Sequence, residues 1–155
     1  AATAAAKDKS LVFNSSKFLP PLYEKLGQYE KAAKGFEDFA KKNPKDPLSV
    51  EYRYNAGLIY DAMNQYDSAV RNFQIYYDNK NGSEKFEVLF LMAKLYERLK
   101  RYDRALGYYD QYMNSGTVNA AGVVEAAYNI SQIHETRRAR KYADDTVFIG
   151  EINDN

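Results

Sequence analysis

Hydrophobic positions in the middle of the chain recur with the period of an α-helix. Between residues 66 and 77, apolar and aromatic side chains fall at i, i+3, i+4, i+7, i+10 and i+11, which is one continuous stripe at 3.6 residues per turn. The preceding segment, VEYRYNAGLIYDAM, carries a similar stripe through Ala56, Ile59, Tyr60 and Met63. The junction NQYD is too short for a crossover, so the pattern predicts two antiparallel helices joined by a tight turn.

This helical hairpin is repeated along the chain. An aromatic residue, a small residue three positions later and a second aromatic residue four further on occur in YEKAAKGF, YDSAVRNF and YDRALGYY. The leading tyrosines, Tyr29, Tyr66 and Tyr102, are 37 and 36 residues apart, and six residues before each stands a further tyrosine, at Tyr23, Tyr60 and Tyr96. A single hairpin cannot bury its apolar stripe alone, so we expect successive hairpins to stack.

The residues at the expected helix crossing and between the hairpins agree with this interpretation. Gly57 and Ala69 would let two helices approach closely, while Tyr60 and Phe73 fill the space beside them. The segments between successive hairpins are rich in Pro, Asn, Gly and Ser. They are Lys41–Pro47, Asp78–Glu84 and Asn114–Gly122, and each stands at the same point of its repeat. We interpret the seven repeat tyrosines as packing residues: Tyr23, Tyr29, Tyr60, Tyr66, Tyr96, Tyr102 and Tyr109.

The pattern Gly57-x2-Tyr60 followed by Ala69-x3-Phe73 resembles the tetratricopeptide repeat. The resemblance implies an all-α solenoid of antiparallel helical hairpins wound into a right-handed superhelix. Residues 13–155 would form this domain, with repeats at about 13–49, 50–85 and 86–123 and a degenerate or capping repeat at 124–155, after an alanine-rich linker at 1–12. In the fourth unit Ser131, His134, Ala143 and Val147 fall at the corresponding spacings.

Some features depart from the family pattern. Pro20 and Pro21 stand where a first helix needs a small residue, so we expect that helix to be short and to begin near Pro20. The repeats are longer than the usual length of about 34 residues, and in this they resemble repeats of bacterial cell-envelope assembly and motility proteins, which favours the periplasm or cell envelope over the cytoplasm. The absence of an initial methionine predicts a piece of a longer protein.

Composition narrows the classes of function. The 155 residues are 45% hydrophobic and 28% charged, as expected for one soluble globular domain. The net charge of +1 provides no field that would attract nucleic acid or an anionic membrane from a distance. With no cysteine, disulfides, thiolate metal sites and cysteine nucleophiles are excluded.

Few residues could support catalysis, so we predict that the chain is not an enzyme. The single histidine, His134, takes the place of Tyr60 and Tyr96 in the earlier repeats, and we interpret it as a packed core or boundary residue. The carboxylate pairs Glu37-Asp38 and Asp144-Asp145 diverge around a helix, and we interpret them as solvated surface. We therefore predict no cofactor and no metal site.

One run of basic residues has two interpretations. Arg137, Arg138, Arg140 and Lys141 could hold an acidic partner, an RNA phosphate or an anionic lipid head. They could equally be solvated residues at a helix end, where cations complement the helix dipole. We favour the solvated interpretation, because a near-neutral chain with its basic residues in one short run fits nucleic-acid recognition poorly.

The family resemblance implies that the first helix of each repeat lines a concave groove for extended or helical peptides. The groove positions would be Glu51, Tyr54, Leu58, Asp61, Glu87, Phe90, Lys94, Glu97, Arg98, Tyr128, Gln132 and Glu135. An aromatic floor between charges of both signs suits a peptide with apolar anchors and mixed charge. The same aromatic residues could instead pack against neighbouring hairpins, and both interpretations stay open.

These observations predict a noncatalytic scaffold that binds a protein or peptide partner and belongs to a larger protein or multiprotein complex. The alternative is a helical repeat that binds nucleic acid or an anionic surface through the basic run.

Overall fold

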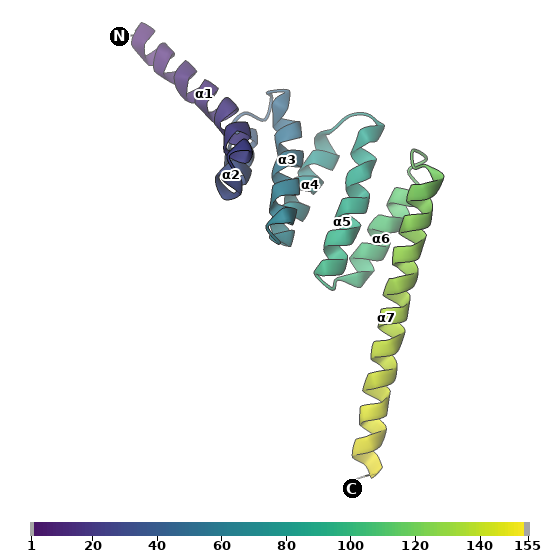
Figure 1. The fold of residues 1–155 in the computed structure, drawn as a ribbon. Helices are drawn as coiled ribbons and strands as arrows, with labels where there is room; N and C mark the ends of the chain where they lie inside the picture. The colour runs from purple at the N-terminus through teal and green to yellow at the C-terminus, as the bar shows by residue number, and fades with distance from the viewer. Residues whose placement is uncertain (1, 154–155) are drawn as a thin grey trace. The chain divides into compact units, whose positions relative to one another are not determined.

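The chain folds into helices throughout the part that the structure describes. The computed structural model describes residues 2–153, and their side chains apart from positions 2, 4 and 144–153. In this part seven α-helices and one 3-10 helix follow one another, without a strand. They are α1 (Ala2–Lys25), α2 (Tyr29–Lys42), α3 (Leu48–Ala62), α4 (Tyr66–Asn79), η1 (Ser83–Phe86), α5 (Glu87–Arg98), α6 (Tyr102–Met113) and α7 (Ala120–Asn153) (Figure 1). The expected all-α helical-repeat class is confirmed.

Three equivalent turns join the two helices of each hairpin. The turn residue with positive φ is Gly27 after α1, Asn64 after α3 and Lys100 after α5, with φ of 70°, 59° and 56°. In each turn the next N–H group returns to a carbonyl five residues earlier at 2.8 Å, as between Gln65 and Tyr60. These bonds satisfy carbonyl groups that a helix end leaves without a partner, and they reverse the chain within three residues.

The chain divides into two compact units, Ala1–Val88 and Leu89–Asn155. In unit 1, α1 packs on α2, α2 on α3 and α3 on α4 (Figure 1). Phe36 and Phe39 of α2 meet Tyr52 of α3, with ring centroids 4.7 and 5.1 Å away. At the crossing of α3 and α4, a Cβ atom built on Gly57 would lie 2.6 Å from Cε1 of Phe73. The close approach expected at Gly57 is therefore present.

The first helix is longer than the prolines predicted. It runs from Ala2 to Lys25 and contains Pro20 and Pro21, so the short helix beginning near Pro20 is wrong, and residues 2–12, expected as a linker, are helical. Proline at position 21 cannot donate to the carbonyl of Lys17. The hydroxyl of Tyr52 donates to that carbonyl instead, at 2.6 Å. A partner from α3 thus replaces the missing helical hydrogen bond.

Pro20 also has a place in the packing of unit 1. It is buried, and a Cβ atom on Gly35 of α2 would lie 2.9 Å from its Cγ. The absence of a side chain at Gly35 provides the space that the proline ring occupies. The break expected from Pro20 and Pro21 is therefore offset by contacts with α2 and α3, which local sequence does not reveal.

Unit 2 is organised around aromatic residues of α6. The buried Tyr109 meets Phe90 of α5 with ring centroids 5.5 Å apart, and Phe90 also contacts Tyr112 at 5.1 Å. The hydroxyl of Tyr109 donates to a carboxylate oxygen of Glu97 and accepts from Nδ2 of Asn129 at 3.1 Å. Burial, followed by the hydrogen bond to Glu97, raises the pKa of Tyr109. One tyrosine thus connects α5, α6 and α7.

The fourth repeat does not form a hairpin. From Ala120 to Asn153 the chain is one continuous helix, α7, because no glycine, proline or asparagine interrupts the segment between Gln132 and Ala143. Ser131 is exposed, Ala143 continues the same helix, and the side chain of Val147 lies outside the described residues. The second helix expected for a degenerate or capping repeat is therefore absent from the described part of this segment.

Two further residues differ from their expected packing roles. His134 is exposed, so the interpretation of this histidine as a packed residue is wrong. The buried side chain at this point of α7 is that of the preceding residue, Ile133. Tyr29 at the start of α2 is 53% exposed, whereas its repeat counterparts Tyr66 and Tyr102 are partly buried. The equivalence of repeat positions therefore weakens toward both ends of the chain.

A half-buried carboxylate joins three helices of unit 1. Glu37 of α2 accepts hydrogen bonds from the hydroxyl of Tyr60 at 2.9 Å and from Arg71 at 3.3 Å, and Arg53 lies 3.5 Å away. Burial alone would raise the pKa of Glu37, but the hydrogen bond from Tyr60 and the charge of Arg71 outweigh it, so its pKa is lowered. Burial and the bond to Glu37 raise the pKa of Tyr60 to about 12. Glu37 is thus an integral part of the packing and not solvated surface.

This network should make the stability of the chain depend on pH in the acid range. Because its folded pKa is lowered, Glu37 stabilises the fold above its unfolded pKa of about 4.5, and this contribution is lost as pH falls through the lower folded value. We expect Glu37→Gln to flatten the decrease in unfolding free energy between about pH 6 and pH 3 in urea titrations. Asp38→Asn, at an exposed neighbour, should keep the parental slope. Equal slopes for all three proteins would contradict the role of Glu37.

Candidate partner-binding surfaces

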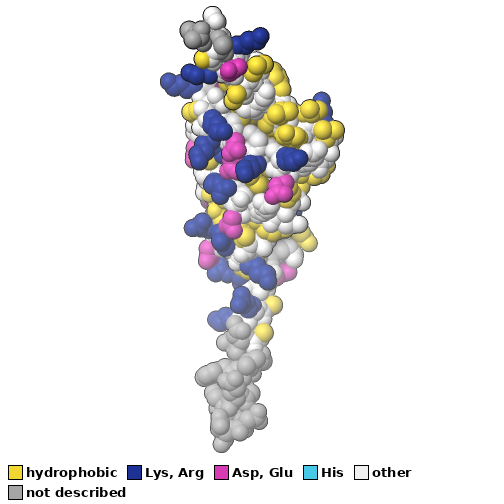
Figure 2. Space-filling view, turned by 90° about the vertical axis from the view of Figure 1, so that its left-hand side faces the viewer, with side chains coloured by type: hydrophobic (Ala, Val, Ile, Leu, Met, Phe, Trp, Pro, Cys, Tyr) yellow, Lys and Arg dark blue, Asp and Glu magenta, His cyan; other side chains and the backbone are white. Residues whose placement is uncertain are grey.

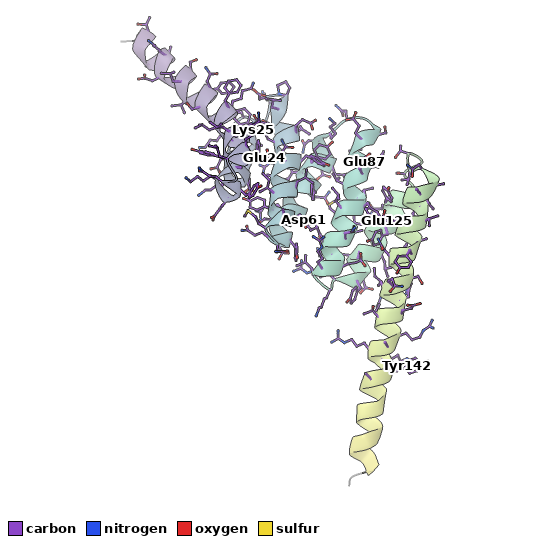
Figure 3. The ribbon with its side chains drawn as sticks, in the orientation of Figure 1. Glu24, Lys25, Asp61, Glu87, Glu125 and Tyr142 are labelled. Carbon is purple, nitrogen blue, oxygen red and sulfur yellow. The ribbon has the colours of Figure 1, made fainter. Side chains whose placement is uncertain are left out.

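The candidate residues of α3 share one face of the helix. Glu51, Tyr54, Leu58 and Asp61 follow at i, i+3, i+7 and i+10, and Asp61 lies near the C-terminal end of α3 (Figure 3). Leu58 is 40% exposed. Tyr54 is partly buried because its ring packs on α4, 5.1 Å from the ring of Tyr76. At this face Leu58 therefore offers more accessible apolar surface than Tyr54.

The candidate residues of α5 are held by contacts with their neighbours. Phe90 is partly buried against α6, and Nζ of Lys94 lies 5.5 Å from the centre of its ring and 3.9 Å from Oε1 of Glu125. Glu97 is engaged by Tyr109, whereas Glu87 and Arg98 are exposed. This face therefore presents charges of both signs around an aromatic side chain that also serves the packing of α5 on α6.

On α7 the candidate residues are open to solvent. Tyr128, Gln132 and Glu135 lie at i, i+4 and i+7, and Tyr128 is 62% exposed. Of the three aromatic residues expected on the groove floor, Tyr54 and Phe90 thus pack within their own hairpins, and Tyr128 remains available. Glu125 lies on the same helix, nearer its N-terminal end (Figure 3).

The four residues of the basic run have different surroundings on α7. Nη1 of Arg137 lies 2.8 Å from Oδ1 of Asp103 in α6, and Arg137 lines a pocket with residues of the α5–α6 turn. Arg138, Arg140 and Lys141 are exposed and do not line that pocket. The other cations of the pocket, Lys100, Arg101 and Arg104, were not predicted from the sequence. Aligning the turn residues of the three repeats could have found them, since the turns after α1 and α3 have uncharged residues where Lys100 and Arg101 stand.

Unit 1 also exposes apolar residues that sequence analysis did not single out. Leu11, Phe18 and Leu22 lie on the side of α1 opposite Phe13 and Pro20, which face α2, and Phe18 is 65% exposed. Figure 2, which views the molecule from the left-hand side of Figure 1, shows hydrophobic side chains gathered toward the upper right, with Lys and Arg around them. The spacing i, i+7, i+11 indicates this stripe once α1 is continuous through its prolines.

Residue groups for other functions were not found in the described part of the chain. Within it, no group of three or more His, Asp or Glu side chains converges as a metal site would require. The side chains of Asp144 and Asp145 lie outside the described residues. None of the described helices combines the length and apolar character needed to cross a membrane.

Comparison with known proteins gives one family. A family model described as "Tetratricopeptide repeat" matches residues 21–62 and again residues 54–116, which together make up more than half of the chain. No curated protein matches the sequence. The two matched ranges include α2, α3, α4, α5 and α6, that is, the helices around the crossing at Gly57 and the core at Tyr109.

Proposed function

Because the chain belongs to the tetratricopeptide repeat family, whose repeats generally mediate protein–protein interaction, we propose that it is a noncatalytic scaffold in a larger protein or multiprotein complex. It binds a protein or peptide partner through the groove positions of its first helices. The observation that carries this proposal is the exposure of Leu58 and Tyr128, each beside charged residues on the face of its own helix.

The chemistry of these faces describes the partner. Leu58 and Tyr128 provide apolar contact, and aromatic side chains often dominate binding energy. Glu51, Lys94 and Glu135 supply charges of both signs. A peptide with apolar anchors separated by residues of mixed charge complements such faces. A location in the periplasm or cell envelope is part of this proposal and rests on the length of the repeats.

A crosslinking pull-down with the intact protein tests the proposal. We expect Leu58→Ser combined with Tyr128→Ala to reduce capture of the partner by about tenfold or more, because each removes an exposed apolar contact worth about 1 kcal/mol or more. Both side chains are substantially exposed, so the melting temperature should change little. Leu48→Ser, at a similarly exposed leucine of α3 outside the candidate face, is the matched control. Equal capture by both variants would place the interface elsewhere.

The alternative function, binding of nucleic acid or an anionic surface, is supported by the exposed Arg138, Arg140 and Lys141. We rank it second because the cations of α7 lie within the five residues Arg137–Lys141, little more than one helical turn, and the whole chain carries a net charge of only +1. Nucleic-acid binding draws on many phosphate contacts along an extended basic surface.

A further inference from the structure

The surface of unit 2 is hollowed beside the turn that joins α5 to α6. A pocket of about 630 Å³ lies between this turn, the first turn of α6 and one arginine of α7, and is lined by Lys100, Arg101, Tyr102, Asp103, Arg104 and Arg137. Four of these side chains are cationic and one is a carboxylate, whereas 22 basic and 21 acidic residues nearly cancel over the whole chain. The pocket therefore concentrates positive charge locally.

Two cations of the pocket have defined partners. Arg137 engages Asp103, with 2.8 Å between Nη1 and Oδ1. Arg104 is held by a neutral group, because its Nη1 donates to the hydroxyl of Tyr96 at 3.2 Å and its guanidinium carbon lies 5.5 Å from the centre of that ring. Tyr96 is itself buried and stacked on Tyr108, with centroids 5.4 Å apart and an interplanar angle of 9°. Arg104 is thus fixed in position without a carboxylate partner there.

The backbone at Lys100 is a second, independent observation. Its φ of 56° lies in the left-handed region, where the equivalent turns have Gly27 and Asn64. Glycine adopts this conformation without steric cost and asparagine does so more readily than most residues, whereas lysine is disfavoured. The same hydrogen bonds close all three turns, so the turn does not itself require lysine. Residues in disfavoured backbone conformations cluster at functional sites, and Lys100 lines this pocket.

The start of α6 adds to the potential of the pocket. Arg101 occupies the N-cap position and makes no side-chain capping bond. The first N–H groups of a helix carry partial positive charge, which favours an anion close to them. The partial positive charge at the N-terminus of α6 therefore adds to the positive potential of the four cationic side chains.

We infer that the pocket binds neighbouring carboxylates of an acidic segment in the protein partner. The inference rests on the proposed function, since it gives the chemistry of one part of that partner. Guanidinium groups bind carboxylates through paired hydrogen bonds, and the ammonium group of Lys100 adds a flexible charge. The cations converge on one pocket instead of following a line, which suits a few closely spaced Asp or Glu side chains better than a nucleic-acid backbone.

Fluorescence anisotropy with a labelled hexaglutamate peptide tests the inference on the full chain. We expect the double variant Lys100→Asn, Arg104→Gln to weaken peptide binding about tenfold or more, because two charge-assisted contacts are lost. Lys31→Gln with Lys34→Gln removes the same charge from α2, where Lys31 is the repeat counterpart of Arg104, and should leave binding unchanged. Lys100→Asn alone should raise the melting temperature by about 2–4 °C while it weakens binding, because asparagine is better suited to the turn.

The outcomes separate this inference from the proposed function. Absence of hexaglutamate binding, or an equal loss in the Lys31/Lys34 variant, would overturn the pocket assignment. If the pull-down through Leu58 and Tyr128 still succeeds, the scaffold proposal stands without the pocket. Tighter binding of a single-stranded oligonucleotide than of hexaglutamate through Lys100 and Arg104 would also overturn the inference and favour the nucleic-acid alternative.

Discussion

Gly57→Ala should destabilise the chain by about 1–3 kcal/mol, although alanine is normally the better helix residue. The new methyl group would lie 2.6 Å from Cε1 and 2.7 Å from Cδ1 of Phe73. Phe73 is completely buried, so its ring cannot move away without disturbing the packing of α3 on α4. Overpacking therefore outweighs the gain in helix propensity. Urea unfolding followed by circular dichroism measures the change.

Gly107→Ala is the matched control for this substitution. Gly107 lies within α6 and is exposed, and a Cβ atom there would have no neighbour within 4 Å. The same change should therefore stabilise the chain, by about 0.5–1 kcal/mol. In a Phe73→Leu background, Gly57→Ala should cost less, by about 0.5 kcal/mol or more, because leucine lacks Cε1 and Cζ, two of the ring atoms nearest to the new methyl group. Stabilisation by Gly57→Ala would show that the helices are farther apart than the structure places them.

Tyr109→Phe should destabilise the chain by about 1–3 kcal/mol, although it removes only one oxygen atom. Tyr109 is completely buried, and its hydroxyl bonds to both Glu97 of α5 and Asn129 of α7. Phenylalanine preserves the ring contacts with Phe90 but leaves a partly buried carboxylate and an amide without this partner. The loss is measured as a lower midpoint of unfolding in urea.

Two comparisons isolate the contribution of the Tyr109 hydroxyl. Tyr128→Phe makes the same chemical change on an exposed side chain of α7, and should alter stability by less than about 0.5 kcal/mol. In a Glu97→Gln background, Tyr109→Phe should cost less, because the charged acceptor is already gone. If Tyr109→Phe and Tyr128→Phe have equal effects, the bonds that join α5, α6 and α7 do not stabilise unit 2.

The sequence was enough to place many of the candidate residues on a helix face, but it could not predict which of their side chains are buried. Helical spacing places Tyr54 and Leu58 on one face of α3, as the structure has them. Spacing does not reveal that Tyr54 packs on Tyr76 while Leu58 remains exposed, since this depends on the neighbouring helix. The basic pocket could not be predicted from spacing either. Arg104 and Arg137 are far apart in the chain, and they line one pocket only because α7 lies against α6.

The repeat of small and aromatic residues was sufficient to predict the helical hairpins of α3 to α6, their antiparallel order and the close crossing at Gly57. It could do so because a 3.6-residue stripe and a short turn are local properties of the chain. The continuation of α1 through Pro20 and Pro21 could not be predicted in this way, because the hydroxyl of Tyr52 and the space at Gly35 come from other helices. The tertiary structure likewise showed that His134 is exposed, since burial on α7 depends on the side that faces α6.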